Sequence, residues 1–298
     1  MRTLLNIDVS RVAAGCFVAA TLTLISVSCN GRGPVLPQQV RAQELVVDLR
    51  IQFGKAANQA NQAVMADTDA LSLEAAGEAR RAREAVESDM RALQPILKEL
   101  GNSDVLKSFD DFTQRFSEYK TLDDTILELA VENTNLKAQR LSFGQGQDAV
   151  NAFRASLRDV ARAASPKDAD KAEARVARAE AAVLEIQVIQ ARHIPESEDA
   201  AMTTMEAQIA TSEAAARSEL ETLKRMGPSI APAIAKAFAA LDRFHATGNE
   251  ILALSRRNTH VRSLALALGR KRTVAAGCDE LLQQLAYELA KREFRPTR

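Results

Sequence analysis

The chain contains an internal duplication, and this feature most constrains how it can fold. Residues 126–144 (ILELAVENTNLKAQRLSFG) align with residues 251–269 (ILALSRRNTHVRSLALALG) at an offset of 125, with identical residues at seven positions. The segments that follow keep the same apolar positions, as at Phe153 and Cys278. Upstream, residues 87–93 (ESDMRAL) resemble residues 217–223 (RSELETL) at an offset of 130. The sequence therefore predicts two copies of one structural unit.

Each copy is predicted to be helical. Hydrophobic residues make up 46% of the chain but aromatic residues only 4%, and alanine with other good helix formers fills the difference. In the first predicted helix, apolar residues recur at a helical spacing, and these are Leu45, Leu49, Phe53, Ala56, Ala60 and Val64. Segments with capping or helix-breaking residues separate about eight such helices, and no segment has the pattern of a strand.

The fold class that this pattern predicts is all-α, with two tandem up-down four-helix bundles. The eight expected helices are 38–66, 70–100, 104–142, 146–164, 167–193, 196–226, 229–267 and 270–293. The first bundle would comprise residues 38–164 and the second residues 167–293, followed by a tail at 294–298. Ser165 and Pro166 would either separate the bundles or kink one long helix that joins them into a rod.

The N-terminal segment has the pattern of an export signal. Arg2 and Arg11 flank a short head, an uncharged stretch follows, and residues 26–29 read Ser-Val-Ser-Cys. Small residues before Cys29 resemble a bacterial lipobox, which predicts residues 1–28 as a lipoprotein-type signal peptide, lipidation of Cys29 and a tether at 29–37. Ser26 stands where a lipobox usually has Leu. An ordinary cleaved signal with secretion, or a retained N-terminal transmembrane helix, therefore stays open.

Charge and motif content limit the possible functions. The 39 basic and 39 acidic residues balance, so no basic excess exists to follow a nucleic-acid backbone. No serine–histidine–acid set, glycine-rich phosphate loop or catalytic carboxylate pair can be placed. The sequence predicts no enzyme and no cofactor.

The repeated Asn-Thr pair is the most informative candidate site. Asn133 and Asn258 fall on the apolar stripes of their predicted helices, where a buried amide needs hydrogen-bonding partners. Such an amide can fix which helices pair, or it can line a polar ligand pocket between helices. The ligand-binding candidates are Asn133, Thr134, Asn135, Asn258, Thr259 and His260.

Basic residues gather beside this motif in the second copy only, at Arg256, Arg257, Arg262, Arg270, Lys271 and Arg272. They indicate a site for an anionic ligand, for which Arg257 and Arg262 are candidates, contact with a phosphate-rich membrane surface, or a solvated face. A separate set, His193, Glu196 and Asp199, could ligate a transition metal. A helix start with acidic residues in its first turn explains the carboxylates equally well.

Several segments resemble a known family. NTNLKAQRLSFG (133–144), its partner RRNTHVRSLALALGRKR (256–272), ANQAVMADTDA (60–70) and FSEYKTLDDTILELA (116–130) are similar to the four-helix-bundle sensory domain of bacterial chemoreceptors (methyl-accepting chemotaxis proteins). The resemblance implies a periplasmic bundle that detects a small molecule or a binding protein and passes a helix displacement to a cytoplasmic signalling domain. No segment here matches that signalling part.

Two functions follow as expectations. The first is an exported, membrane-anchored sensory module of the periplasm or cell envelope that binds a small polar or anionic ligand and acts on a membrane receptor or kinase. The alternative is a structural or protein-interaction lipoprotein of the envelope without a small-molecule ligand. A homodimer is compatible with both.

Overall fold

The computed structural model describes residues 35–291, and every regular element in that range is helical. The predicted signal peptide, Cys29 and the tail at 294–298 lie outside the described residues. The α-helices are α1 (Val35–Met65), α2 (Asp69–Leu100), α3 (Ser103–Glu132), α4 (Thr134–Leu141), α5 (Gln147–Ala163), α6 (Ala169–His193), α7 (Asp199–Lys224), α8 (Ala231–Arg257), α9 (Thr259–Leu266) and α10 (Arg272–Ala290). The all-α prediction is confirmed.

Two of the eight expected helices are each divided by an asparagine, so the described residues form ten α-helices. Asn133 ends α3 and Asn258 ends α8, with φ of 45° and 51°, the only positive φ values of described residues other than glycine. Asparagine tolerates this left-handed conformation better than most residues. The repeated asparagines are thus buried, as predicted, but they change the direction of the chain and do not lie within a continuous helix.

The break expected at Gly144–Gly146 does not separate helices, whereas the backbone kinks at Gly269, where φ is −91° and ψ is −106°. The chain passes through one π-helical turn at Ser142–Gly146 into α5, and through another at Ala267–Lys271 into α10. Because a π turn adds a residue without ending the helix, α4 and α5 form one nearly continuous segment. The α9–α10 segment is kinked at Gly269.

The helices form two bundles that differ from the predicted tandem pair. Bundle A contains α1, α2, α3 and the α9–α10 segment, and its core joins residues 42–122 to residues 274–289. Bundle B contains the α4–α5 segment, α6, α7 and α8, and its core lies within residues 149–244. The expected boundaries at 38–164 and 167–293 are therefore wrong as packing units, because each copy contributes its fourth helix to the bundle of the other copy.

A buried charge pair accompanies this exchange in bundle A. Lys271 Nζ lies 2.9 Å from Asp123 Oδ1, and Arg83 Nη1 donates to Asp123 Oδ2 at 3.1 Å. All three side chains are nearly inaccessible, with Asp123 at 0% exposure. A lysine in this place requires a carboxylate opposite it.

Glycines occupy the equivalent positions in bundle B. The offset of 125 relates Lys271 to Gly146 and Asp123 to Gly248. A Cβ at Gly248 would lie 2.7 Å from Gln190 Nε2, and a Cβ at Gly146 would lie 3.6 Å from Ile251 Cδ1. Lys271 in that place would have no carboxylate at position 248, and the Gln190 side chain occupies the space beside Gly248. The charge and the volume at these positions therefore favour the exchanged arrangement.

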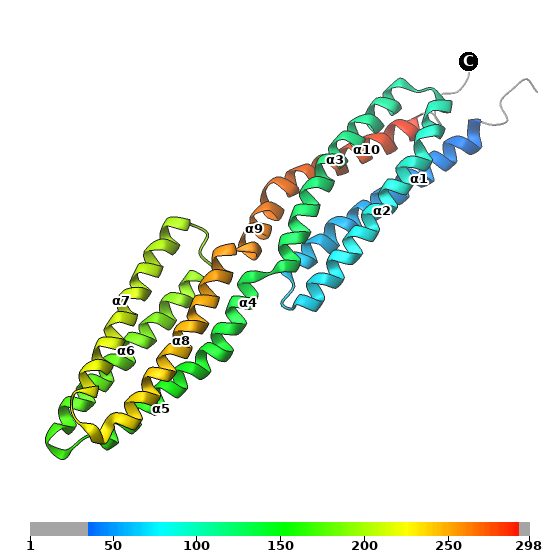
Figure 1. Ribbon diagram of the computed structural model, residues 1–298. Coiled ribbons are helices and arrows are strands. Elements are labelled where there is room, and N and C mark those ends of the chain that lie inside the picture. Colours follow the sequence, from blue (N-terminus) through cyan, green and yellow to red (C-terminus); the bar gives the residue numbers. More distant parts are fainter. Residues whose placement is uncertain (1–34, 292–298) are drawn as a thin grey trace, which may run out of the picture.

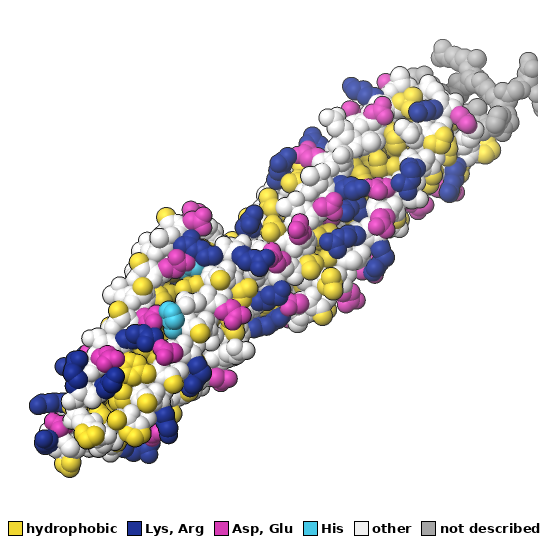
Figure 2. Space-filling model, in the orientation of Figure 1, with side chains coloured by type: hydrophobic (Ala, Val, Ile, Leu, Met, Phe, Trp, Pro, Cys, Tyr) yellow, Lys and Arg dark blue, Asp and Glu magenta, His cyan; other side chains and the backbone are white. Residues whose placement is uncertain are grey.

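The two bundles lie end to end in an elongated molecule, and the chain crosses between them at α3–α4 and α8–α9 (Figure 1). The described parts of α1 and α10 begin and end at the same outer end of bundle A. Basic and acidic side chains are interspersed over the visible face of both bundles (Figure 2). Within residues 35–291, no helix has the length and apolar character needed to cross a membrane.

Candidate functional site at the joint between the bundles

The two repeated threonines hold the crossing point together. The Thr134 backbone N–H donates to Thr259 Oγ1 at 2.9 Å, and the Thr259 backbone N–H donates to Thr134 Oγ1 at 3.2 Å. Each hydroxyl therefore caps the first turn of the helix to which the other belongs. The repeated Asn-Thr motif forms a nearly two-fold joint, which explains why both copies carry it.

The neighbouring amides fasten the joint to the α6–α7 turn. Asn135 Nδ2 donates to Asn258 Oδ1 at 2.8 Å and to the Ile194 carbonyl at 2.5 Å. Asn258 Nδ2 donates to the Glu196 carbonyl, and Asn135 Oδ1 accepts from the His260 backbone N–H. Six predicted ligand-binding residues thus come together, but Thr134, Asn135, Asn258 and Thr259 satisfy one another.

A cavity of about 400 Å³ lies beside these bonds. Its polar lining includes Asn133, Asp67 and His260, and its apolar lining includes Leu136, Phe143, Ile194 and Val261. Asn133 is 1% exposed, yet its buried Oδ1 accepts no hydrogen bond from the described residues. A buried acceptor without a donor is costly, so Asn133 Oδ1 is a polar atom that the joint leaves unsatisfied. We call this space the joint cavity.

The predicted arginine candidates do not line the joint cavity. Arg257 forms an ion pair with Glu132, and Arg262 is exposed. No lysine or arginine contributes to the lining. The expected anion site beside the Asn-Thr motif is therefore not formed by these residues.

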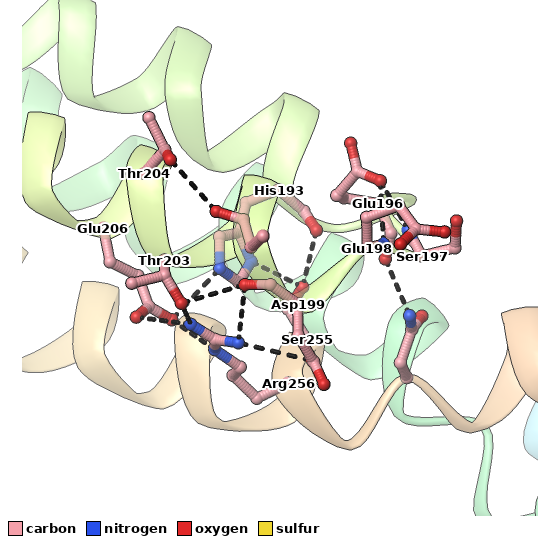
Figure 3. A network of polar contacts seen from close by, with 12 residues as sticks. His193, Glu196, Ser197, Glu198, Asp199, Thr203, Thr204, Glu206, Ser255 and Arg256 are labelled. Carbon is pink, nitrogen blue, oxygen red and sulfur yellow. Dashed lines mark hydrogen bonds and ion pairs between the residues drawn. The ribbon is translucent and has the colours of Figure 1, made fainter.

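A second polar network lies next to the joint, in bundle B (Figure 3). His193 is fully buried, with Nδ1 2.8 Å from Ser255 Oγ and Nε2 3.2 Å from Glu206 Oε1. Arg256 forms two hydrogen bonds to the Glu206 carboxylate, at 2.7 and 2.8 Å. Ser255 has 0% exposure and donates to the His193 carbonyl. No substrate reaches this hydroxyl, so the serine, histidine and glutamate form a structural network, not a nucleophilic triad.

The pKa values in this network follow from burial and from the arginine. Burial lowers the pKa of His193, and the opposing carboxylate of Glu206 only partly offsets this effect. Hydrogen bonds from Arg256 lower the pKa of Glu206.

Acidification should therefore weaken the fold through His193. Because the pKa of His193 is lower in the folded than in the unfolded chain, the unfolded chain binds more protons as pH falls below about 6.5. We expect the free energy of unfolding to fall between pH 7 and pH 5, with a slope of at most about 1.4 kcal/mol per pH unit from this group. Urea unfolding at several pH values should show a shallower slope for His193→Gln, and parallel slopes would contradict this origin.

The predicted metal ligands are engaged elsewhere. The Glu196 carboxylate accepts from the backbone N–H groups of Ser197 and Glu198, and Asp199 pairs with Arg256. Residues 35–291 contain no group of three or more His, Cys, Asp or Glu side chains placed to hold a metal ion. The geometry gives the metal interpretation no support, and the helix-start interpretation agrees with these contacts.

The buried Arg83–Asp123–Lys271 cluster is the polar feature that the sequence interpretation missed. By sequence, Lys271 belongs to a run of basic residues, yet it is 2% exposed, and burial lowers its pKa. Its Nζ lies 5.5 Å from the centre of the Tyr119 ring. The replacement of Gly146 by Lys271 and of Gly248 by Asp123 between the copies was the available signal, since the two changes are complementary in charge.

Comparison of the sequence with models of known protein families, and with curated proteins, gave no match. The fold and the site therefore rest on the geometry described above.

Proposed function

We propose that this protein is an exported, membrane-anchored sensory module that binds a small polar molecule in the joint cavity. The observation that carries the proposal is the position of the cavity. Met65 at the end of α1 and Asp67 in the α1–α2 turn of bundle A line it, together with Ile194 and Pro195 from the α6–α7 turn of bundle B. A molecule bound there contacts both bundles, so its binding free energy depends on the angle between them.

Two features support a change in that angle. The connections at Asn133 and Asn258 are single left-handed residues, which can absorb backbone rotation without unfolding a helix. The resemblance of the repeated segments to chemoreceptor sensory domains agrees with such a displacement. In this proposal the output is given by a separate membrane receptor or kinase.

A structural or protein-interaction role is the second candidate. The mutual hydrogen bonds of Thr134, Thr259, Asn135 and Asn258 favour it, because a joint held in this way can keep two bundles in a fixed geometry. The two candidates differ in whether a ligand changes the angle at the joint.

A screen followed by a distance measurement tests the proposal. Small amines, organic acids, alcohols and amides are first screened for a rise in Tm of the protein. Spin labels are then placed at Lys107→Cys and Lys236→Cys, exposed positions on α3 and α8 near the outer ends of the two bundles, with Cys16 and Cys29 changed to Ser. We expect a stabilising compound to shift the distance distribution between the labels. If no compound raises the Tm or moves the labels, the structural role is favoured.

Membrane attachment through Cys29 is tested separately. Labelled palmitate should be incorporated in bacterial cells by the wild-type chain and lost in Cys29→Ser, with Cys16→Ser as the control that keeps the label. Absence of label in the wild type would leave signal cleavage alone or a retained N-terminal helix.

A further inference from the structure

The two halves of the joint carry different side chains at the equivalent positions 135 and 260. The offset of 125 relates Asn135 to His260 and Asn133 to Asn258. In one half, the Asn135 side-chain amide donates to Asn258 Oδ1. In the other half, the equivalent donor would come from the side chain of residue 260, but His260 has an imidazole there, and Asn133 Oδ1 receives no hydrogen bond from the described residues. Asn133 Oδ1 is therefore the acceptor whose partner the replacement by His260 has removed.

The surroundings of this free acceptor define the chemistry of a ligand. Asp67 also lines the joint cavity, and its carboxylate forms no ion pair with the described residues. No cationic lysine or arginine side chain lines the cavity, so an anionic group would enter without compensation. The apolar walls formed by Leu136, Phe143, Ile194 and Val261 suit a short hydrocarbon chain.

Resting on the proposed function, we infer that the joint cavity binds a small primary amine with a short apolar chain. The ammonium group donates to Asn133 Oδ1 and faces the Asp67 carboxylate, and the hydrocarbon part lies against the apolar walls. The pairing of a buried neutral acceptor with a more exposed carboxylate gives hydrogen bonding and charge complementarity at one end of the ligand. The neighbouring arginines led us to expect an anionic ligand from the sequence, whereas the cavity lining favours a cationic one.

Three probes of similar size but different charge test the ligand class. Butylammonium, butanol and butyrate are titrated into the full chain, and backbone amide shifts of residues 133–136 and 258–261 are recorded by NMR. We expect butylammonium to bind at least tenfold more tightly than butyrate, with butanol between them. Equal or tighter binding of butyrate at these residues would overturn the amine inference but leave a small-molecule site at the joint.

Variants at two related positions test the acceptor. His260→Asn supplies the missing amide donor, so it should weaken butylammonium binding at least tenfold while the Tm stays the same or rises. Asn133→Gly keeps a residue that tolerates positive φ and removes the acceptor, so it should also abolish binding. Arg262→Gln, on the same helix but outside the cavity, is the matched control and should bind as the wild type does.

Two outcomes separate this inference from the proposed function. Unchanged butylammonium affinity in both His260→Asn and Asn133→Gly would overturn the role of Asn133 Oδ1. If no probe perturbs the joint amides, the amine class is wrong. The screen of other compounds, followed by the spin-label distance measurement between the two bundles, then decides independently whether the joint binds any small molecule.

Discussion

A fragment spanning residues 134–257 should fold by itself, whereas the first sequence copy, residues 38–164, should not form a stable monomeric bundle. The first fragment contains all four helical segments of bundle B and its entire main core. The second contains α5, whose Phe153 and Leu157 are fully buried against helices of the other copy. Circular dichroism and thermal unfolding should show a cooperative transition for residues 134–257 only.

A matched chain made from two segments extends this test to bundle A. Residues 35–132 joined by a short flexible linker to residues 259–291 contain α1, α2, α3 and the α9–α10 segment, and should also unfold cooperatively. If residues 38–164 were monomeric in ultracentrifugation and as stable as the full chain, the exchange of fourth helices would be contradicted.

Replacing Asp123 by Ala should cost about 3–5 kcal/mol of the free energy of unfolding. The change removes the carboxylate between Lys271 and Arg83 and leaves the buried Lys271 without an ion-pair partner among the described residues, whereas Arg83 keeps its pair with Asp124. Replacing Lys271 and Asp123 together by Met and Leu should be far less harmful, because an apolar pair of similar volume needs no partner charge. Denaturant unfolding of the single and double variants measures the difference.

An exposed ion pair provides the control for that result. Asp159 pairs with Arg162 one helical turn away on α5, with side chains 46% and 75% exposed. Asp159→Ala should therefore change the free energy of unfolding by less than about 1 kcal/mol. A loss for Asp123→Ala as small as this would show that the buried cluster contributes little to the fold.

The helices could be predicted because their signal is local. Apolar spacing and capping residues placed most helix ends within a few residues, as at α2 and α6. The division at Asn133 was not predicted, since an asparagine on an apolar stripe has the same pattern whether it continues a helix or ends one. The break predicted at Gly144 is absent because a π turn keeps that segment helical, whereas the backbone does leave helical dihedral angles at Gly269.

The arrangement of the bundles could not be obtained from the repeat alone. Apolar residues at equivalent positions of the two copies, such as Phe153 and Cys278, can pack into the core of either bundle. Helical periodicity therefore does not distinguish tandem packing of the copies from the exchanged packing. The distinction lies in long-range pairs, such as Asp123 with Lys271, which periodicity does not reveal and which only the differences between the two copies at these positions indicate. For the same reason the sequence identified the joint residues but not that the threonines bond to each other across it.

The position of the outer ends of α1 and α10 has a mechanical consequence. Both lie at the same outer end of bundle A, and the backbone of the described residues passes between the bundles only at the two asparagine crossings. A force that pulls α1 and α10 apart would first peel helices from bundle A, while bundle B would bear no tension until that bundle had opened. Bundle B is thus mechanically shielded by bundle A, which contains α1 and α10.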